Sequence, residues 1–154
     1  MSLIVEEGPT PRGLVSSSCK PPVTLLHLGP GLANGLANLH NARRAASPIV
    51  NVGGDHAVTH AQYDAPLASD VVGFARPVSA WVHSAVSART VGADTARAVQ
   101  AARHHPGQIA TLILPADVAW NEGASPAPAL VPVGPAEVSG GAVAAAVAAV
   151  RSAG

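Results

Sequence analysis

Two short stretches of the sequence carry residues that could do acid–base chemistry. His27 ends one apolar run, and Asp55, His56 and His60 follow another. Imidazole exchanges protons near neutral pH, and a carboxylate accepts hydrogen bonds or acts as a base. A histidine at the end of a buried strand is often a satisfied core residue, although functional residues gather at the carboxyl ends of parallel strands. We therefore predict that His27 is catalytic and that Asp55, His56 and His60 form a polar loop facing a substrate or cofactor.

A metal site is the alternative function for the same loop. His56 and His60 are four residues apart, and Asp55 and Asp64 lie nearby. This spacing is convincing on a helix that also supplies a third ligand and a glutamate base, as in H-E-x-x-H. Here it follows a Gly-Gly pair that predicts a tight turn, and no such glutamate is present. We predict no metal site, and a metal-dependent hydrolase using His56, His60 and Asp64 remains the third functional hypothesis.

A glycine turn, Gly29-Pro30-Gly31, follows the first apolar run. Its simplest explanation is a tight strand-to-helix connection. A functional explanation is that missing side chains let a flat heterocycle approach the backbone, while amides at the start of the next helix meet acceptor or anionic groups. The positions of Gly29, Gly31 and Gly35 do not match the dinucleotide motif G-x-G-x-x-G. Gly29, Gly31 and Asn34 are therefore cofactor-binding candidates, although Asn34 also suits a capping or surface position.

The elements that must position these residues form a strand–helix–strand unit over residues 22–66. Residues 23–28 are almost continuously apolar, which predicts a strand covered on both faces. Three leucines then recur at helical spacing before a second apolar strand. A strand that returns through a helix to a parallel strand is a βαβ unit. We predict an α/β fold, a parallel-sheet three-layer α/β/α domain of about four or five strands, with His27 and His56 at the same edge.

The remaining elements extend this pattern along the chain. The sequence predicts a short helix over 67–74, a strand over 77–83, a helix capped by Ser87 and a strand over 109–114. Proline, glycine, alanine and serine then predominate, which is typical of a linker. The predicted organisation is a poorly defined N-terminal segment (1–21), one domain (22–122), a linker (123–138) and, capped by Ser139, the first helix of a truncated central domain (139–154).

Composition and charge exclude several classes of function. The 154 residues are 48% hydrophobic and 12% charged, which suits one packed domain and argues against a disordered tail. Nine basic and nine acidic side chains give zero formal net charge, so we expect neither nucleic-acid nor membrane binding. The single cysteine, Cys19, excludes an intrachain disulfide. Because no signal peptide is evident and no apolar run reaches about 20 residues, we expect a cytoplasmic protein.

Three stretches resemble the pyrimidine-binding domain of thiamine-diphosphate enzymes, in the branch that holds acetolactate synthase and benzoylformate decarboxylase. They are HLGPGLANGLANLHNARRAASPIVNVGGD from His27, QYDAPL from Gln62 and PGQIATLILPADV from Pro106. The histidine before the glycine turn, the asparagine three residues after Gly31 and the Ser-Pro pair before a strand carry the resemblance. It covers residues 22–122 and implies a partial thiamine-diphosphate-binding fold.

The resemblance implies a cofactor, a substrate class and a role for His27. The cofactor would be thiamine diphosphate with Mg²⁺, and the substrate a 2-oxo acid such as pyruvate, attacked by the thiazolium ylid. In benzoylformate-decarboxylase-like members a histidine at the position of His27 faces the thiazolium and handles protons. The implied enzyme is an acetolactate-synthase-like transferase or lyase, and a non-catalytic α/β module for assembly or regulation is the alternative.

Two features of the family are missing from the sequence. Family members carry a catalytic glutamate near the start of this domain, and Glu7-Gly8 lacks the alanine-rich helix that should follow it. They also bind Mg²⁺ in a separate domain through Gly-Asp-Gly and a later asparagine, a motif that does not occur here. We therefore expect a fragment, a truncated product or one half of a split enzyme, inactive alone. A homo-oligomer or a complementary enzyme domain would complete it.

Overall fold

Four short apolar runs pair side by side in the computed structural model, which describes residues 20–153. They are β1 (Val23–His27), β2 (Ile49–Asp55), β3 (Trp81–Ser84) and β4 (Ile109–Pro115). Neighbouring strands are all parallel, in the order β1-β2-β4-β3. The predicted parallel α/β fold is therefore confirmed, with β1 and β3 as its two outer strands.

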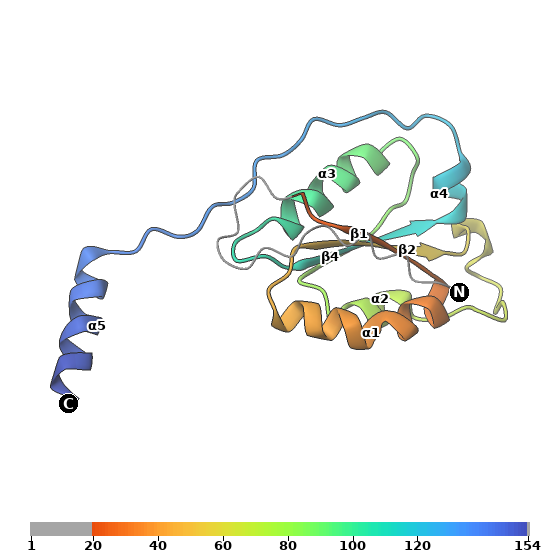
Figure 1. The fold of residues 1–154 in the computed structure, drawn as a ribbon. Coiled ribbons are helices and arrows are strands. Elements are labelled where there is room, and N and C mark those ends of the chain that lie inside the picture. The colour runs from red at the N-terminus through yellow and green to blue at the C-terminus, as the bar shows by residue number, and fades with distance from the viewer. Residues whose placement is uncertain (1–19, 154) are drawn as a thin grey trace.

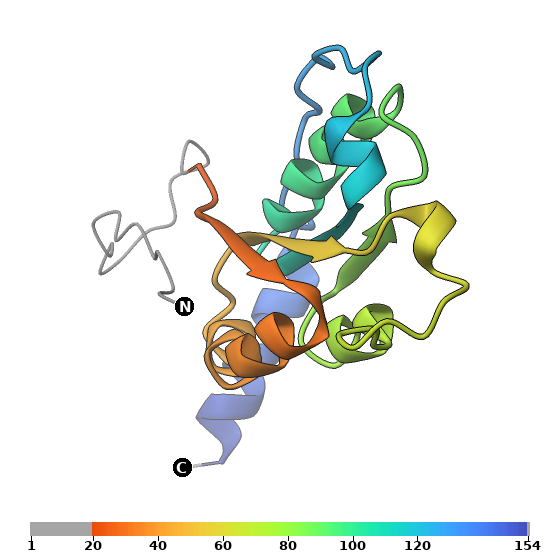
Figure 2. The ribbon, with the colours of Figure 1, turned by 90° about the vertical axis from the view of Figure 1, so that its right-hand side faces the viewer.

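Helices cover both faces of the sheet and make three layers (Figure 1). On one face lie α1 (Leu28–Arg44) and α2 (Val71–Ala75), and on the other lie α3 (Val91–Ala102) and the short α4 (Ala116–Trp120). Figure 2 shows these two helical layers on either side of the strands. Large side chains such as Leu32 and Ile113 fill the first interface, whereas Ala98 and Ala102 let α3 pack closely on the second.

A row of hydrogen-bonded polar side chains crosses the sheet. The hydroxyl of Thr24 donates to Asn51 at 2.8 Å, and the Asn51 amide donates to Thr111 at 3.2 Å. The hydroxyls of Ser79 and Thr111 lie 2.7 Å apart. Asn51 and Thr111 are fully buried, so losing these partners would leave polar groups unsatisfied. The row joins β1, β2 and β4 at one level and favours the register in which their ends meet.

The start of α1 differs from the prediction. The helix begins at Leu28, so Gly29 and Gly31 are buried in its first turn instead of forming a turn before it. Leu28 has φ of 57°, in the left-handed region, and this one residue makes the change from strand to helix. The Gly53-Gly54 pair also remains within β2, so the tight turn predicted there is wrong.

The outer strand β1 is covered on one face only, contrary to the prediction of two. Leu26 is buried on the α1 side, whereas Val23 and Leu25 are 60% and 72% exposed. Alternate residues of a strand point to opposite faces, so Val23 and Leu25 face the α3 side. The reason for their exposure is strand order, because α3 packs mainly on β4, β2 and β3.

Other boundaries shift by a few residues. β3 is shorter than the strand predicted over 77–83, and α2 occupies only part of the helix predicted over 67–74 and extends one residue beyond it. Thr90, and not Ser87, is the N-cap of α3, and α4 was not predicted. The predicted cap of the last helix, α5 (Gly140–Ser152), is confirmed, because Ser139 Oγ accepts a hydrogen bond from the Ala142 N–H at 3.1 Å.

The predicted linker is extended, and its first part lies along α3 (Figure 1). Gln100 Nε2 donates to the carbonyl of Val131 at 2.7 Å, and a Cβ at Gly92 would overlap the carbonyl of Ser125. The helix α5 stands apart from the sheet, with its valines exposed. Within residues 20–153, no helix combines the length and apolar character needed to cross a membrane.

Candidate functional site

The carboxyl ends of the four strands meet at one edge of the sheet, which we call the carboxyl edge. β1 ends at His27, β2 at Asp55, β3 at Ser84 and β4 at Pro115. In register, His27 pairs with Gly54 and Asp55 pairs with Pro115. The structure therefore places His27 and the residues just after β2 at the same edge. This is where open parallel sheets bind their ligands.

His27 presents an exposed imidazole at this edge. Its ring has no hydrogen-bond or ion-pair partner among residues 20–153. The ring lies over Gly54 of β2, because a Cβ placed on Gly54 would come within 2.8 Å of His27 Nδ1. The left-handed Leu28 follows directly, so the chain turns away from the edge immediately after the imidazole. An exposed, unpaired imidazole at this position is able to exchange a proton with a ligand.

The three cofactor-binding candidates on α1 are less favourably placed than His27, because two are buried and the third lies beyond the first turn of the helix. Gly29 and Gly31 are buried in the first turn. A Cβ on Gly29 would overlap Ser69, so the space left by the missing side chain is filled by the chain itself. Asn34 is exposed at the seventh position of α1, beyond the first turn whose amides are free. Their role in cofactor binding stays a prediction.

The loop after β2 brings together the other predicted residues. Asp55 Oδ1 accepts a hydrogen bond from the N–H of His56 at 2.8 Å. The rings of His56 and His60 have centroids 5.8 Å apart, and those of His60 and Tyr63 are 5.3 Å apart. Nε2 of the half-buried His56 is itself buried and has no hydrogen-bond partner. Residues 20–153 contain no group of three or more side chains able to hold a metal ion, so the hydrolase hypothesis gains no support.

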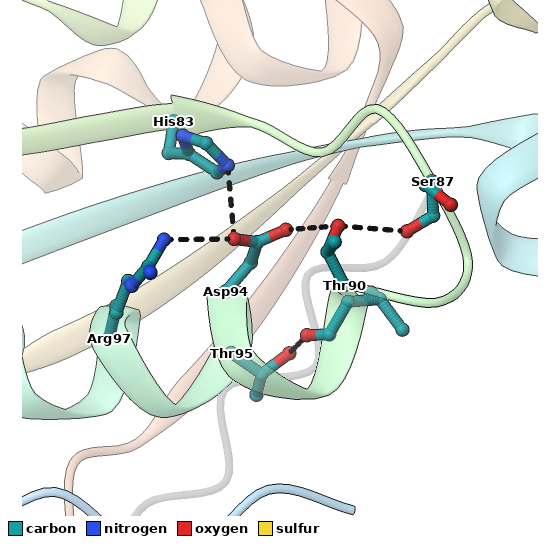
Figure 3. A network of polar contacts seen from close by, with 7 residues as sticks. His83, Ser87, Thr90, Asp94, Thr95 and Arg97 are labelled. Atoms are coloured by element: carbon teal, nitrogen blue, oxygen red, sulfur yellow. Dashed lines mark hydrogen bonds and ion pairs between the residues drawn. The ribbon is translucent and has the colours of Figure 1, made fainter. Parts of the chain in front are cut away.

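A second polar network, which the sequence did not predict, lies at the other outer strand (Figure 3). Asp94 on α3 is 4% exposed, and its Oδ1 lies 3.2 Å from His83 Nε2 and 3.6 Å from Arg97 Nη1. Thr90 Oγ1 donates to Asp94 Oδ2 at 3.1 Å. The Trp81 ring lies beside His83, with centroids 5.6 Å apart. We interpret this cluster as structural, because both oxygens of the buried carboxylate have partners within the domain.

One signal in the sequence could have revealed the buried carboxylate. Asp94, Ala98 and Ala102 follow one another at a spacing of four, so they share one face of α3. Both alanines are fully buried, and Asp94 is buried with them. A carboxylate on an apolar face needs a hydrogen-bonding partner, and the facing strand β3 offers His83.

Comparison with solved structures supports the class of fold. The chain matches the thiamine diphosphate-dependent 4-hydroxybenzoylformate decarboxylase of Rhodococcus jostii RHA1 with a TM-score of 0.70, over 84% of this chain and 25% of that one. The sequence identity is 20%, so this likeness shows the fold alone. The three layers and the carboxyl edge therefore define an α/β domain of the kind that forms the thiamine-diphosphate-binding part of such enzymes.

Comparison with sequences shows the family. Residues 12–74 match the family described as thiamine pyrophosphate enzyme, N-terminal TPP binding domain. The acetolactate synthase large-subunit homologue IlvX of Mycobacterium tuberculosis is 56% identical over 122 residues, 77% of this chain. The acetolactate synthase large subunit IlvG of the same organism is 32% identical over 101 residues, 66% of this chain. The chain therefore belongs to the thiamine pyrophosphate enzyme family, and it matches the N-terminal domain of that family. It spans 24% of the length of IlvX and 18% of the length of IlvG.

Proposed function

We propose that the domain binds the pyrimidine side of thiamine diphosphate at its carboxyl edge and serves an acetolactate-synthase-like enzyme. The observation that carries this proposal is His27. It lies inside the segment that matches the family, and it is an exposed imidazole at the ligand-binding edge of the sheet. The relatives named as acetolactate synthases support a 2-oxo acid, such as pyruvate, as the substrate.

The exposed His27 ring above Gly54 suits a flat, polar ligand, whereas the predicted opening beside Gly29 is filled. Gly54 has no side chain, and the space above it accommodates the His27 ring. Because the ring is exposed and has no hydrogen-bond partner among residues 20–153, a ligand could bind the imidazole directly. Gly29 offers no comparable opening, because Ser69 fills the space beside it. We accordingly assign the main role to His27 and the residues that follow β2.

The chain would contribute proton handling to the reaction. Thiamine diphosphate, when bound, would supply the carbanion chemistry that acts on a 2-oxo acid. His27 would hold or deliver a proton at the carbonyl oxygen of the substrate, because its ring is exposed and has no polar partner among residues 20–153. Asp55 and His56 would border the substrate on the side of β2. The diphosphate and Mg²⁺ would be held by another domain, since residues 20–153 provide no cluster of metal ligands.

A second copy or a complementary enzyme domain is the proposed partner. Val23 and Leu25 leave part of the sheet uncovered on the α3 side, and exposed apolar surface on an outer strand favours association. The same observation supports the alternative function, a non-catalytic module for assembly. Sedimentation of the purified chain, compared with Leu25→Lys, tests the association itself, because an assembly through β1 weakens with the added charge. Binding of thiamine diphosphate then separates an enzyme domain from a non-catalytic module.

Titration followed by NMR tests cofactor binding directly. Thiamine diphosphate should shift the backbone amides of His27, Gly54 and Asp55, whereas inorganic diphosphate alone should not. Shifts confined to β3 and α3, or none at millimolar thiamine diphosphate, would overturn the proposal.

Turnover by the isolated chain is a separate expectation. Without a carboxylate at the pyrimidine and a metal-bound diphosphate, acetolactate should not form from pyruvate and thiamine diphosphate with Mg²⁺. A domain that buries only part of its ligand should also bind it weakly. Calorimetry and an acetolactate assay check both points, and micromolar binding with turnover would contradict them.

A further inference from the structure

The loop that carries His56 and His60 contains a short helical turn without a cap of its own. This turn, η1 (Val58–His60), is preceded by Ala57, whose side chain cannot accept a hydrogen bond. The first N–H groups of any helical turn lack partners inside the turn. A turn of three residues has little internal hydrogen bonding, so its position depends strongly on what satisfies its first N–H.

A carboxylate from a distant part of the chain supplies that partner. Asp117 Oδ1 accepts a hydrogen bond from the N–H of Val58 at 3.0 Å and another from the N–H of Val118 at 3.1 Å. Asp117 follows β4 and Val58 follows β2, and the ends of these strands pair through Asp55 and Pro115. The side chain thus links two segments that leave neighbouring strands at the carboxyl edge.

The hydrogen bond between Asp117 and Val58 affects the candidate site because the η1 turn carries His60 and follows His56. Asp55 Oδ1 holds the N–H of His56, and Asp117 Oδ1 holds the N–H of Val58, so the backbone is fixed on both sides of Ala57. His60 ends the turn, and its ring contacts His56. Two carboxylates therefore hold the backbone that carries both imidazoles.

We propose that Asp117, in the first turn of α4, is a positioning residue that caps the η1 turn and thereby sets His56 and His60 at the ligand-binding edge. It acts through the backbone of Val58 and touches neither substrate nor cofactor. The proposal rests on the proposed function for the role of the edge, but the cap itself is defined by the two hydrogen bonds alone. A catalytic role for Asp117 is disfavoured, because one of its oxygens already accepts two backbone N–H groups.

Three variants test the cap. Asp117→Ala removes both hydrogen bonds, Asp117→Asn keeps an oxygen acceptor, and Glu122→Ala removes an exposed carboxylate just after α4 as the matched control. Amide hydrogen exchange and the imidazole ¹⁵N shifts of His56 and His60 are measured by NMR on the full chain. In Asp117→Ala, exchange at Val58 should accelerate at least about tenfold, and both imidazole signals should move.

The controls separate a local cap from general stability. Exchange at Leu112 and Ile113, in the centre of β4, should stay within about twofold in all variants, and Asp117→Asn should restore most of the protection at Val58. Unchanged exchange and imidazole shifts in Asp117→Ala would overturn the proposal. A uniform acceleration throughout β4, not rescued by Asp117→Asn, would overturn it as well. If Asp117→Ala does not fold, Asp117→Asn decides, because its neutral oxygen is a weaker acceptor than a carboxylate. Exchange at Val58 should then accelerate slightly, by about twofold, and no change at all would overturn the proposal.

A thiamine diphosphate titration of the same samples distinguishes this proposal from the proposed function. The cap predicts that Asp117→Ala reduces ligand-induced shifts at His56 at least about threefold, with rescue by Asp117→Asn. If the unmodified chain shows no response to thiamine diphosphate, the proposed function fails while the exchange at Val58 still decides the cap. If the chain responds and Asp117→Ala responds equally, the positioning role fails and the proposed function stands.

Discussion

His27 and His83 occupy comparable places in the fold but have opposite surroundings. Each lies at or next to the carboxyl end of an outer strand, His27 on β1 and His83 on β3. His83 pairs with the buried carboxylate of Asp94, whereas the His27 ring has no polar partner among residues 20–153. The difference arises from α3, which packs over β3 and leaves the same face of β1 uncovered.

His83 stabilises the fold, whereas His27 is available to a ligand. A side chain bound to a buried carboxylate stabilises the domain, and replacing it changes the free energy of unfolding. An exposed imidazole without partners contributes little to stability, so its replacement leaves the fold intact. The two outer strands should therefore respond differently to mutation. Replacing His27 on β1 should change function, and breaking the pair of His83 and Asp94 at β3 should change stability.

The largest expected effect is functional and belongs to His27. In a full-length acetolactate-synthase-like enzyme that carries this domain, His27→Ala should lower kcat about 100-fold, the usual size of a lost proton transfer, and change cofactor affinity little. The free energy of unfolding should change by less than about 0.5 kcal/mol. Steady-state kinetics and calorimetry measure both, with the exposed His40→Ala on α1 as the control. Equal kinetics for His27→Ala and the parent would exclude His27 from the catalytic machinery.

The second effect is on stability and belongs to the network at β3. Asp94→Ala should lower the free energy of unfolding by about 2 kcal/mol, because His83, Arg97 and Thr90 lose their common partner while some of them remain in reach of water. Urea denaturation of the purified chain measures the loss. Thiamine diphosphate should still shift the amides of His27 and Gly54. An Asp94→Ala variant as stable as the parent would remove the contrast between the outer strands β1 and β3.

The sequence predicts the elements better than their surroundings. The apolar run that became β4 and the cap of α5 were predictable, because propensity and Ser139 act locally. The exposure of Val23 and Leu25 was not, because the same apolar run fits a central or an outer strand until the strand order is known. The start of α1 was also missed, since a leucine in the left-handed conformation runs against its local preference.

The candidate site divides in the same way. His27 at the end of a strand follows from local pattern and from the parallel sheet, so sequence could place it at the carboxyl edge. Asp117 as the cap of a turn after β2 could not be foreseen, because its partner Val58 lies 59 residues away along the chain. The pair of His83 and Asp94 likewise depends on how α3 lies on β3. Long-range pairs of this kind need the tertiary structure.

A third and smaller effect tests the position of the His27 ring. A Cβ on Gly54 would lie 2.8 Å from His27 Nδ1, closer than atoms of this kind approach, so Gly54→Ala should turn the exposed ring aside. The ring can move into solvent, and alanine suits a strand better than glycine, so unfolding should change by less than about 0.5 kcal/mol. The ligand-induced shift at His27 should fall, with a loss of about 1 kcal/mol in binding.

Gly53→Ala is the matched control for this prediction. Its Cβ would point to the opposite face and meet Ile113 and Val71 at an ordinary 3.7 Å. The His27 imidazole signal and the response to thiamine diphosphate should stay as in the parent. If both alanine variants change the His27 signal alike, the ring does not depend on the space above Gly54, and the described geometry of the edge is wrong.

The smallest expected effect concerns the last turn of α1. It tests whether the stability of the domain can be changed without altering the environment of His27 at the carboxyl edge. Ala46 follows α1 with φ of 51°. The N–H groups of Ala46 and Ser47 donate to the carbonyls of Arg43 and Ala42, which is the Schellman pattern in which glycine normally occupies the left-handed position. Ala46→Gly should therefore raise the free energy of unfolding by about 0.5 kcal/mol, because relief of the left-handed strain is partly offset by the greater freedom of glycine in the unfolded chain.

The neighbouring Ala45 gives this prediction its control. Ala45 has φ of −83°, which alanine adopts without strain, so Ala45→Gly should stabilise nothing and cost a few tenths of a kcal/mol through added freedom of the unfolded chain. Urea denaturation of both variants measures the difference in sign. Ala46 lies near the amino ends of the strands, so Ala46→Gly should leave the amide and imidazole signals of His27 unchanged. A shift of those signals would mean that α1 transmits changes from its last turn to its first, and the carboxyl edge would then depend on the stability of the whole helix.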